Sequence, residues 1–177
     1  MPKFIIKISR PGAESLLEDP NLECFVFSSA LPEDYLQMQT ARAAQAGKIV
    51  LLEGENAAML CPRLNADGVI ADLSASAVVK KEMAALRRQI GSRFLGVICR
   101  NRRHEAMIVS ENEPDFIIFK IWRDGAEKTR ELAEWYHEFF LLQMAVEPED
   151  EDADVLSYPC DMAILSPETY KILVAKK

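Results

Sequence analysis

Short apolar runs recur at nearly even spacing along the chain, and this rhythm limits the fold more than any other feature. The runs begin at Phe4, Cys24, Lys48, Asp67, Arg93, Asp115, Phe139 and Cys160, at intervals of 19 to 26 residues. Most of them are followed by a segment with helical character. Repeated strand–helix units of this length predict a parallel sheet, and eight such units close into a barrel.

The helical character is clearest between Val79 and Ile90. Val79, Met83, Leu86 and Ile90 follow one another at the spacing of a single helix stripe, and Gly91 stands where a helix commonly ends. A second stripe consists of Leu132, Trp135, Tyr136 and Phe139. The strands are apolar throughout, as expected where helices cover one face of a parallel sheet and a barrel interior covers the other.

The chain length narrows the architecture further. The 177 residues are 49% hydrophobic, enough for a real core, and residues 1–177 are predicted to form a single domain. An eight-unit barrel usually needs about 200 residues or more. The predicted fold is therefore α/β, a compact (β/α)8 TIM barrel with trimmed loops. A doubly wound sheet with six units is the alternative, and it requires that some of the eight runs are not strands.

Charge and composition exclude several classes of function. The formal net charge is −7, whereas nucleic-acid and membrane-surface proteins carry basic patches. No run approaches the roughly 20 apolar residues of a membrane span, and the first run is too short for a signal peptide. The four cysteines are scattered and form no CxxC pair. These features predict a reduced, cytoplasmic protein with no nucleic-acid or membrane partner.

In a barrel, the chemistry lies at the carboxyl ends of the strands. A basic cluster follows the fifth and sixth runs; it comprises Arg100, Arg102, Arg103, Lys120 and Arg123. Beside helix N-termini, such cations favour a small anionic ligand. The alternative is that some of these arginines pair with acids on the surface.

Acidic residues form two further candidate sites. Six carboxylates lie between Glu147 and Asp154, where phosphate-binding barrels usually have glycine-rich loops. This stretch is interpreted as a solvated loop, with a divalent-cation site as the alternative. Glu53 and Asp72 end adjacent strands and either share a hard cation such as Mg²⁺ or cap the helices that follow.

Two residues near the basic cluster were considered for catalysis. His104 is placed in the first turn of a helix, where a structural role is favoured over acid–base catalysis. Cys99 lies beside Arg100, which would lower a thiol pKa, but no second residue completes a nucleophile–base pair. The catalytic residues are therefore unknown from the sequence.

Several segments resemble thiamine-phosphate synthases. LNADGVIADLSAS resembles the family's fourth strand, RFLGVICRNRRHEAM and EPDFIIF its fifth and sixth, and LAEWYHEFF and CDMAIL its last helix and strand. The resemblance extends from about Cys24 onward. It implies a TIM barrel that joins a pyrimidine diphosphate to a thiazole phosphate with Mg²⁺ and releases pyrophosphate.

Most of the residues that this chemistry requires are replaced. Around the place of the Gln-x-Arg-x-Lys string after the second strand, this chain has Phe27, Ser28 and Ser29. Glu53-Gly54 takes the place of the Asn-Asp pair, and Ile70 that of the strand-four histidine. Lys128 corresponds to a lysine after the sixth strand, and the acidic stretch replaces the glycine loop.

The resemblance leads to three hypotheses. The first is a degenerate homologue, a pseudoenzyme that lacks synthase activity and binds a small phosphate-bearing or thiamine-related anion. The second is an active synthase, a transferase that uses Glu53 and Asp72 for Mg²⁺ and Arg100, Lys120, Arg123 or Lys128 for phosphates. The third is a non-catalytic partner-binding or regulatory protein. The sequence leaves the oligomeric state open, because an apolar residue such as Trp122 is compatible with a subunit contact as well as with a pocket lining.

Overall fold

The computed structural model describes residues 1–151 and 154–175 and shows a closed barrel of eight parallel strands in sequential order, β1 to β8. The strands are β1 (Lys3–Ile8), β2 (Cys24–Ser28), β3 (Ile49–Glu53), β4 (Gly68–Asp72), β5 (Phe94–Ile98), β6 (Phe116–Ile121), β7 (Gln143–Pro148) and β8 (Met162–Leu165). β1 pairs with both β2 and β8, which closes the ring. The predicted TIM barrel is confirmed, and the doubly wound alternative is wrong.

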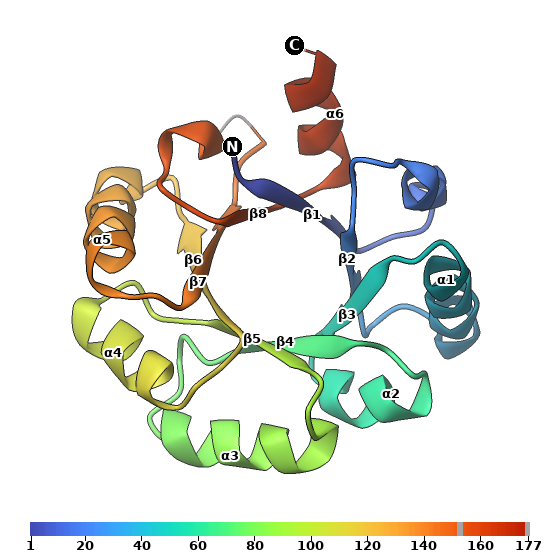
Figure 1. The fold of residues 1–177 in the computed structure, drawn as a ribbon, viewed down its shortest axis with the longest axis horizontal. Coiled ribbons are helices and arrows are strands. Elements are labelled where there is room, and N and C mark those ends of the chain that lie inside the picture. The colour runs from blue at the N-terminus through green and yellow to red at the C-terminus, as the bar shows by residue number, and fades with distance from the viewer. Residues whose placement is uncertain (152–153, 176–177) are drawn as a thin grey trace.

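The helices form an outer ring around the strands (Figure 1). They are α1 (Glu33–Gln45), α2 (Ala57–Arg63), α3 (Val79–Ile90), α4 (Arg103–Glu111), α5 (Ala126–Phe139) and α6 (Pro167–Ala175). In the described part of the chain, short 3-10 turns replace the helices after β1 and β7, namely η1 (Glu14–Glu18) and η2 (Val155–Ser157). This substitution is how a chain of 177 residues completes eight units.

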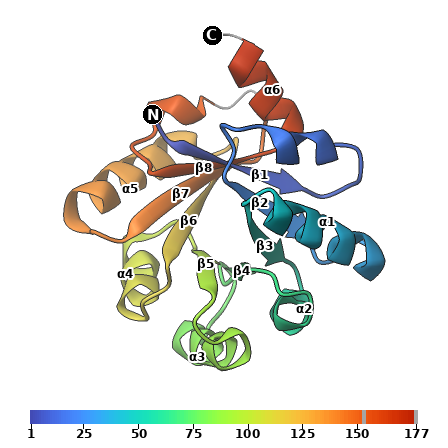
Figure 2. The ribbon, with the colours of Figure 1, turned by 45° about the vertical axis from the view of Figure 1, so that its right-hand side comes forward.

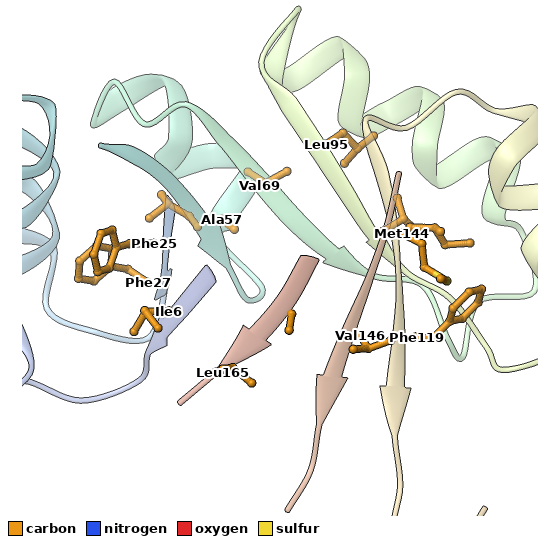
Figure 3. Close-up of a cluster of buried hydrophobic side chains, with 14 of the residues drawn as sticks. Ile6, Phe25, Phe27, Ala57, Val69, Leu95, Phe119, Met144, Val146 and Leu165 are labelled. Atoms are coloured by element: carbon orange, nitrogen blue, oxygen red, sulfur yellow. The ribbon is translucent and has the colours of Figure 1, made fainter. Parts of the chain in front are cut away.

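Two buried layers hold the barrel together. The larger one lies between the strands and the helices, and Figure 3 shows part of it, including Phe25, Phe27, Phe119 and Met144. The smaller one consists of the alternate strand residues that fill the interior; these are Ile5, Val26, Leu51, Ile70, Ile98, Phe116, Ile118, Ala145 and Ile164. The interior is thus a packed core, as in other small barrels.

Three aspartates join neighbouring strands at the amino end of the barrel. The Asp67 carboxylate accepts the backbone N–H of Val50, Asp115 accepts that of Leu95, and Asp161 accepts that of Met144, at 2.7 to 2.9 Å. Each aspartate stands just before one strand and binds the preceding strand. The aspartate that precedes each of these three apolar runs therefore serves to join neighbouring strands of the sheet.

One strand boundary differs from the expectation. The sequence predicts a seventh strand from Phe139, but that residue is the last of α5, and β7 begins at Gln143. Phe140 follows the helix and stacks on Tyr136 with ring centroids 4.5 Å apart. The apolar run continues across the boundary because these aromatic rings pack on one another at the end of the helix.

Candidate functional site

Four charged side chains lie at the carboxyl ends of the strands, directly above the interior core. Lys7, Glu53, Lys120 and Glu147 each stand two positions after a core residue of the same strand (Ile5, Leu51, Ile118 and Ala145). Because side chains alternate along a strand, all four follow the inward-facing set. A layer of charged side chains therefore covers the apolar interior at the carboxyl ends of the strands, the face where barrel enzymes carry their active sites.

Lys7 lies between two carboxylates at the centre of this layer. Its Nζ is 2.6 Å from Glu53 Oε2 and 2.7 Å from Glu147 Oε1. The Lys7 side chain is 24% exposed, and those of Glu53 and Glu147 are 14% and 11% exposed. We call these three residues the lysine triad. They come from β1, β3 and β7, so the triad forms only when the barrel closes.

Burial and charge shift the pKa values within the triad. Burial alone would lower the pKa of the Lys7 ammonium, but the charges of Glu147 and Glu53 outweigh it, and the pKa is raised. Burial raises the pKa of the Glu53 carboxyl, and the nearby Glu147 adds to the rise, while Lys7 offsets only part of it. Lys7 is therefore a fixed cation, and Glu53 is a carboxylate that takes up a proton more readily than usual.

A cavity of about 640 Å³ opens beside the triad, within the size range of small-molecule sites. Its polar lining includes Lys7, Ser9, Ser28, Glu53 and Asp72, and Ile70 and Leu73 add apolar surface. Glu55 and Glu82 line the same cavity. The cavity wall next to β4 and α3 is thus acidic. An anionic group of a ligand would therefore bind more favourably at the opposite wall of the cavity.

The metal candidates Glu53 and Asp72 both line this cavity. Glu53 binds Lys7, and Asp72 Oδ1 accepts hydrogen bonds from the Ser74 N–H at 3.0 Å and the Ser74 hydroxyl at 2.6 Å. Among residues 1–151 and 154–175, no three His, Cys, Asp or Glu side chains gather as a metal site would require. A Mg²⁺ ion shared by Glu53 and Asp72 stays a prediction, and it would have to compete with the Lys7 ammonium.

The structure separates the four predicted anion-binding residues. Lys120 lies opposite Glu147 in the β6–β7 register, with its ammonium over the Trp122 ring. Arg123 forms two hydrogen bonds with the Asp150 carboxylate, at 2.9 and 3.0 Å, as expected of surface pairing. Arg100 lines a different cleft, and Lys128 is exposed on α5. Their role as ligands stays a prediction.

The acidic stretch does not act as one unit. Glu147 belongs to the lysine triad, and Asp150 pairs with Arg123. Glu149 and Glu151 are exposed, as expected of a solvated loop, and Asp152 lies outside the described residues.

Cys99 is buried, and burial followed by the nearby Glu105 charge raises the pKa of its thiol to about 12, which argues against a thiolate nucleophile.

Sequence reasoning missed Lys7, and it recognised Glu147 as the residue after the seventh strand but grouped it with the acidic stretch. Lys7 lies inside the first apolar run and was not among the candidate site residues. The available signal was position: each residue stands two places beyond an inward-facing apolar residue, at the carboxyl end of its strand. A buried lysine at that position requires a carboxylate partner.

Comparison with known proteins identifies the fold. No protein-family model matches the chain, and no curated protein sequence matches it. Solved structures do match. An aldolase from Escherichia coli K12 has a TM-score of 0.74 at 12% identity, covering 98% of this chain and 78% of the aldolase.

Two further structures match over nearly their whole length. A triosephosphate isomerase from Bartonella henselae has a TM-score of 0.66 at 12% identity, with 100% of both chains covered. A 3-keto-L-gulonate-6-phosphate decarboxylase from Vibrio cholerae has a TM-score of 0.62 at 9% identity, covering 99% of this chain and 98% of the other. At these identities the likeness establishes a shared TIM-barrel fold.

These findings overturn the resemblance to thiamine-phosphate synthases. The similar structures include an aldolase, an isomerase and a decarboxylase, and no protein-family model matches. The physical reason is visible in the segments that carried the resemblance. DGVIA, DFIIF and CDMAIL share the aspartates that bind the preceding strand, so they report barrel construction. In the described residues, no helix is long and apolar enough to cross a membrane.

Proposed function

We propose that this protein is an enzyme that moves a proton next to the carbonyl group of a small hydroxycarbonyl compound. The observation that carries the proposal is the lysine triad, a fixed cation held between two carboxylates beside a cavity at the carboxyl end of the barrel. Such sites combine a base with a group that stabilises developing negative charge.

Glu53 is the proposed base. Its raised pKa makes it a better proton acceptor near neutral pH than an ordinary glutamate. It takes the proton from the carbon beside the carbonyl, the C–H electron pair forms a C=C bond, and the carbonyl π electrons move to oxygen. The proton then returns from Glu53 to the same carbon, or to the former carbonyl carbon while the hydroxyl proton of the enediolate moves from one oxygen to the other, so the reaction is balanced and needs no co-reactant.

Lys7 is the proposed electrostatic partner. The carboxylates of Glu53 and Glu147 keep its ammonium charged, and it donates a hydrogen bond to the substrate carbonyl oxygen, where negative charge develops. A neutral amine is needed to form an imine with a carbonyl. The raised pKa of Lys7 therefore favours enolate stabilisation over imine chemistry. Glu147 orients Lys7 from the side opposite Glu53.

The substrate is proposed to be phosphorylated. The names of two similar structures, triosephosphate isomerase and 3-keto-L-gulonate-6-phosphate decarboxylase, specify small phosphorylated compounds. In this chain, Glu55, Asp72 and Glu82 repel an anion on one side of the cavity. The phosphate end would therefore lie toward Lys120, which is close enough to lower the pKa of Glu53 by its charge.

The test is exchange of carbon-bound hydrogen in D₂O, followed by proton NMR. The panel comprises dihydroxyacetone phosphate, ribulose 5-phosphate and fructose 6-phosphate, each with and without Mg²⁺, which also tests the predicted Glu53–Asp72 metal site. We expect exchange with at least one compound, a loss of at least 100-fold in Glu53→Gln, and an acid limb with a pKa above that of an ordinary glutamate.

Glu55→Gln is the matched control, because Glu55 lines the same cavity but is exposed and outside the triad. At saturating substrate this variant should keep its exchange rate within about threefold, since the Glu55 charge acts on the phosphate end and is not in contact with the reacting carbon. Exchange that survives in Glu53→Gln, or no exchange with any compound above the protein-free rate, would overturn the proposal.

A further inference from the structure

A second cleft lies on the flank of the barrel, between α3 and α4, and it shares no lining residue with the lysine-triad cavity. Its volume is about 820 Å³, and it is lined by residues 76–81, Ala84, Arg100, His104, Glu105 and Ile108. These residues come from the first turns of α3 and α4 and the segments that precede them. The cleft is therefore separate from the proposed catalytic site.

The lining of this cleft is basic in a protein whose net charge is −7. Lys80, Lys81 and Arg100 are cationic, His104 adds a ring N–H donor, and the lining holds a single acid, Glu105. Within the described residues, none of the four forms an ion pair with a carboxylate, in contrast to Arg10, Arg42, Arg63, Arg87 and Arg123. Positive charge without protein counter-charges, gathered in a cleft, favours an anion.

Two other features add specificity. The N-cap residues of α3 and α4, Val78 and Arg102, make no side-chain hydrogen bond to the first turn, so backbone N–H donors remain there for an anion. Each first turn also carries one acid, Glu82 in α3 and Glu105 in α4, as the first turn of α6 does. The Glu105 Oε2 atom is buried and accepts no hydrogen bond in the described structure. A buried carboxylate oxygen requires a donor, and a ligand hydroxyl would supply one once the Glu105 side chain turns into the cleft, since the oxygen is covered in this structure.

The usual phosphate position of such barrels is already filled. In the loop after β7, Arg123 is held by the Asp150 carboxylate. At the start of α6, Ser166 Oγ accepts the Thr169 N–H, and the Glu168 carboxylate occupies the first turn, where it pairs with Arg10. Anion binding after β7 and β8 is disfavoured by these carboxylates.

We infer that the cleft between α3 and α4 binds a phosphate monoester that also carries a hydroxyl group. Arg100, His104 and the two lysines contact the phosphate, and Glu105 accepts the hydroxyl. The site goes beyond the proposed catalytic function and does not depend on it. A phosphorylated metabolite bound here would lie beside the segment that joins β4 to α3, and this segment also lines the lysine-triad cavity.

The test is a titration with glycerol 3-phosphate, with glycerol as the uncharged probe, followed by amide NMR in 150 mM KCl. We expect glycerol 3-phosphate to shift the amides of residues 79–81 and 103–105 and glycerol to shift none of them. The double variant Arg100→Gln/His104→Gln should bind at least tenfold more weakly. Arg88→Gln, an exposed charge near the other end of α3, should bind within twofold of the original protein.

Two further variants separate the contributions. Glu105→Ala should leave inorganic phosphate at least as tightly bound, because a negative charge is removed, and should weaken glycerol 3-phosphate by about threefold relative to inorganic phosphate, because the hydroxyl acceptor is lost. Glu53→Gln should leave this binding unchanged, so failure of the proposed catalytic function would not affect the result. Shifts scattered over all basic surfaces, or equal weakening by Arg88→Gln, would overturn the inference.

Discussion

At the scale of single residues, two strand glycines show how little space separates neighbouring strands. A Cβ atom on Gly68 would lie 2.2 Å from the carbonyl oxygen of Phe94, its partner in β5. A Cβ atom on Gly96 would lie 2.3 Å from the Phe116 ring. The first obstacle is backbone, and the second is the end of a side chain that also borders a cavity at the amino end of the barrel.

We therefore expect Gly68→Ala and Gly96→Ala to differ in stability. Gly68→Ala should lose roughly 3 kcal/mol or more of unfolding free energy, because the β4–β5 pairing itself must move. Gly96→Ala should lose about 1 kcal/mol, since the Phe116 ring can turn into the neighbouring cavity. Urea unfolding measures both values. Equal losses would show that the Phe116 ring is as fixed as the backbone.

At the scale of elements, the sequence predicts what local pattern determines. The spacing of Val79, Met83, Leu86 and Ile90 gave α3 with its end before Gly91, as observed. The 3-10 turns η1 and η2 were not foreseen, because three to five residues cannot display a helical period. The start of β7 was misplaced because the apolar run continues through the end of α5.

A hydrogen bond joins the last helix, α6, to the segment that follows η1 near the start of the chain. The Tyr170 hydroxyl on α6 donates to Asp19 Oδ2, beside η1, at 2.9 Å, and the Tyr170 ring packs edge-on against Phe4. Figure 2 shows α6 and the segment around η1 on the same side of β1. Burial, followed by the hydrogen bond to Asp19 and the Asp19 charge, raises the pKa of Tyr170 to about 12.

We expect Tyr170→Phe to lower the unfolding free energy by about 1 kcal/mol at pH 7, the usual value of one such hydrogen bond. Burial tends to raise the pKa of Asp19, but hydrogen bonds from Asn21 and Tyr170 outweigh it and hold the pKa below its ordinary value. Stability from a lowered carboxyl pKa is present above the unfolded pKa and is lost as pH falls through the folded pKa. The difference between the two proteins should therefore shrink below about pH 4.

Urea unfolding between pH 7 and pH 3 measures this effect. A double-mutant cycle with Asp19→Asn provides the control, because the two substitutions should be less than additive if the hydroxyl and carboxylate act on each other. Full additivity would contradict the assignment, and so would a difference between the proteins that stays constant with pH.

At the scale of the whole molecule, the site depends on contacts that no local pattern encodes. Strand tips could be located from the sequence, so Glu53, Lys120 and Arg100 were found as candidates. The partners of Lys7 could not be found in this way, because Glu147 is 140 residues away and meets it only after β1 pairs with β8. The resemblance to thiamine-phosphate synthases was wrong for a related reason. The segments that carried it contain the residues that join neighbouring strands of the barrel.

The lysine triad makes a prediction about the stability of the whole barrel. Lys7→Met removes the cation between Glu53 and Glu147 and leaves two carboxylates in the same enclosed space. Breaking a buried ion pair in this way costs about 3–5 kcal/mol, and the partial exposure of Lys7 favours the lower end. The expected loss at pH 8 is therefore about 3 kcal/mol.

The pH dependence gives the sharper readout. Without Lys7, mutual repulsion raises the pKa of the two carboxyls in the folded state, so the folded variant binds more protons than the unfolded chain below pH 8. Stability then rises as pH falls toward 5.5, and the deficit of Lys7→Met relative to the original protein should decrease over this range.

The matched control is Lys3→Met, on the same strand and with the same orientation. Lys3 pairs with Glu23, and the side chains of these two residues are 76% and 70% exposed. Exposed pairs contribute little, so this variant should lose less than about 1 kcal/mol at every pH. A Lys7→Met deficit that is no larger than that of Lys3→Met, or that grows as pH falls, would show that the two carboxylates do not depend on Lys7 for their charge.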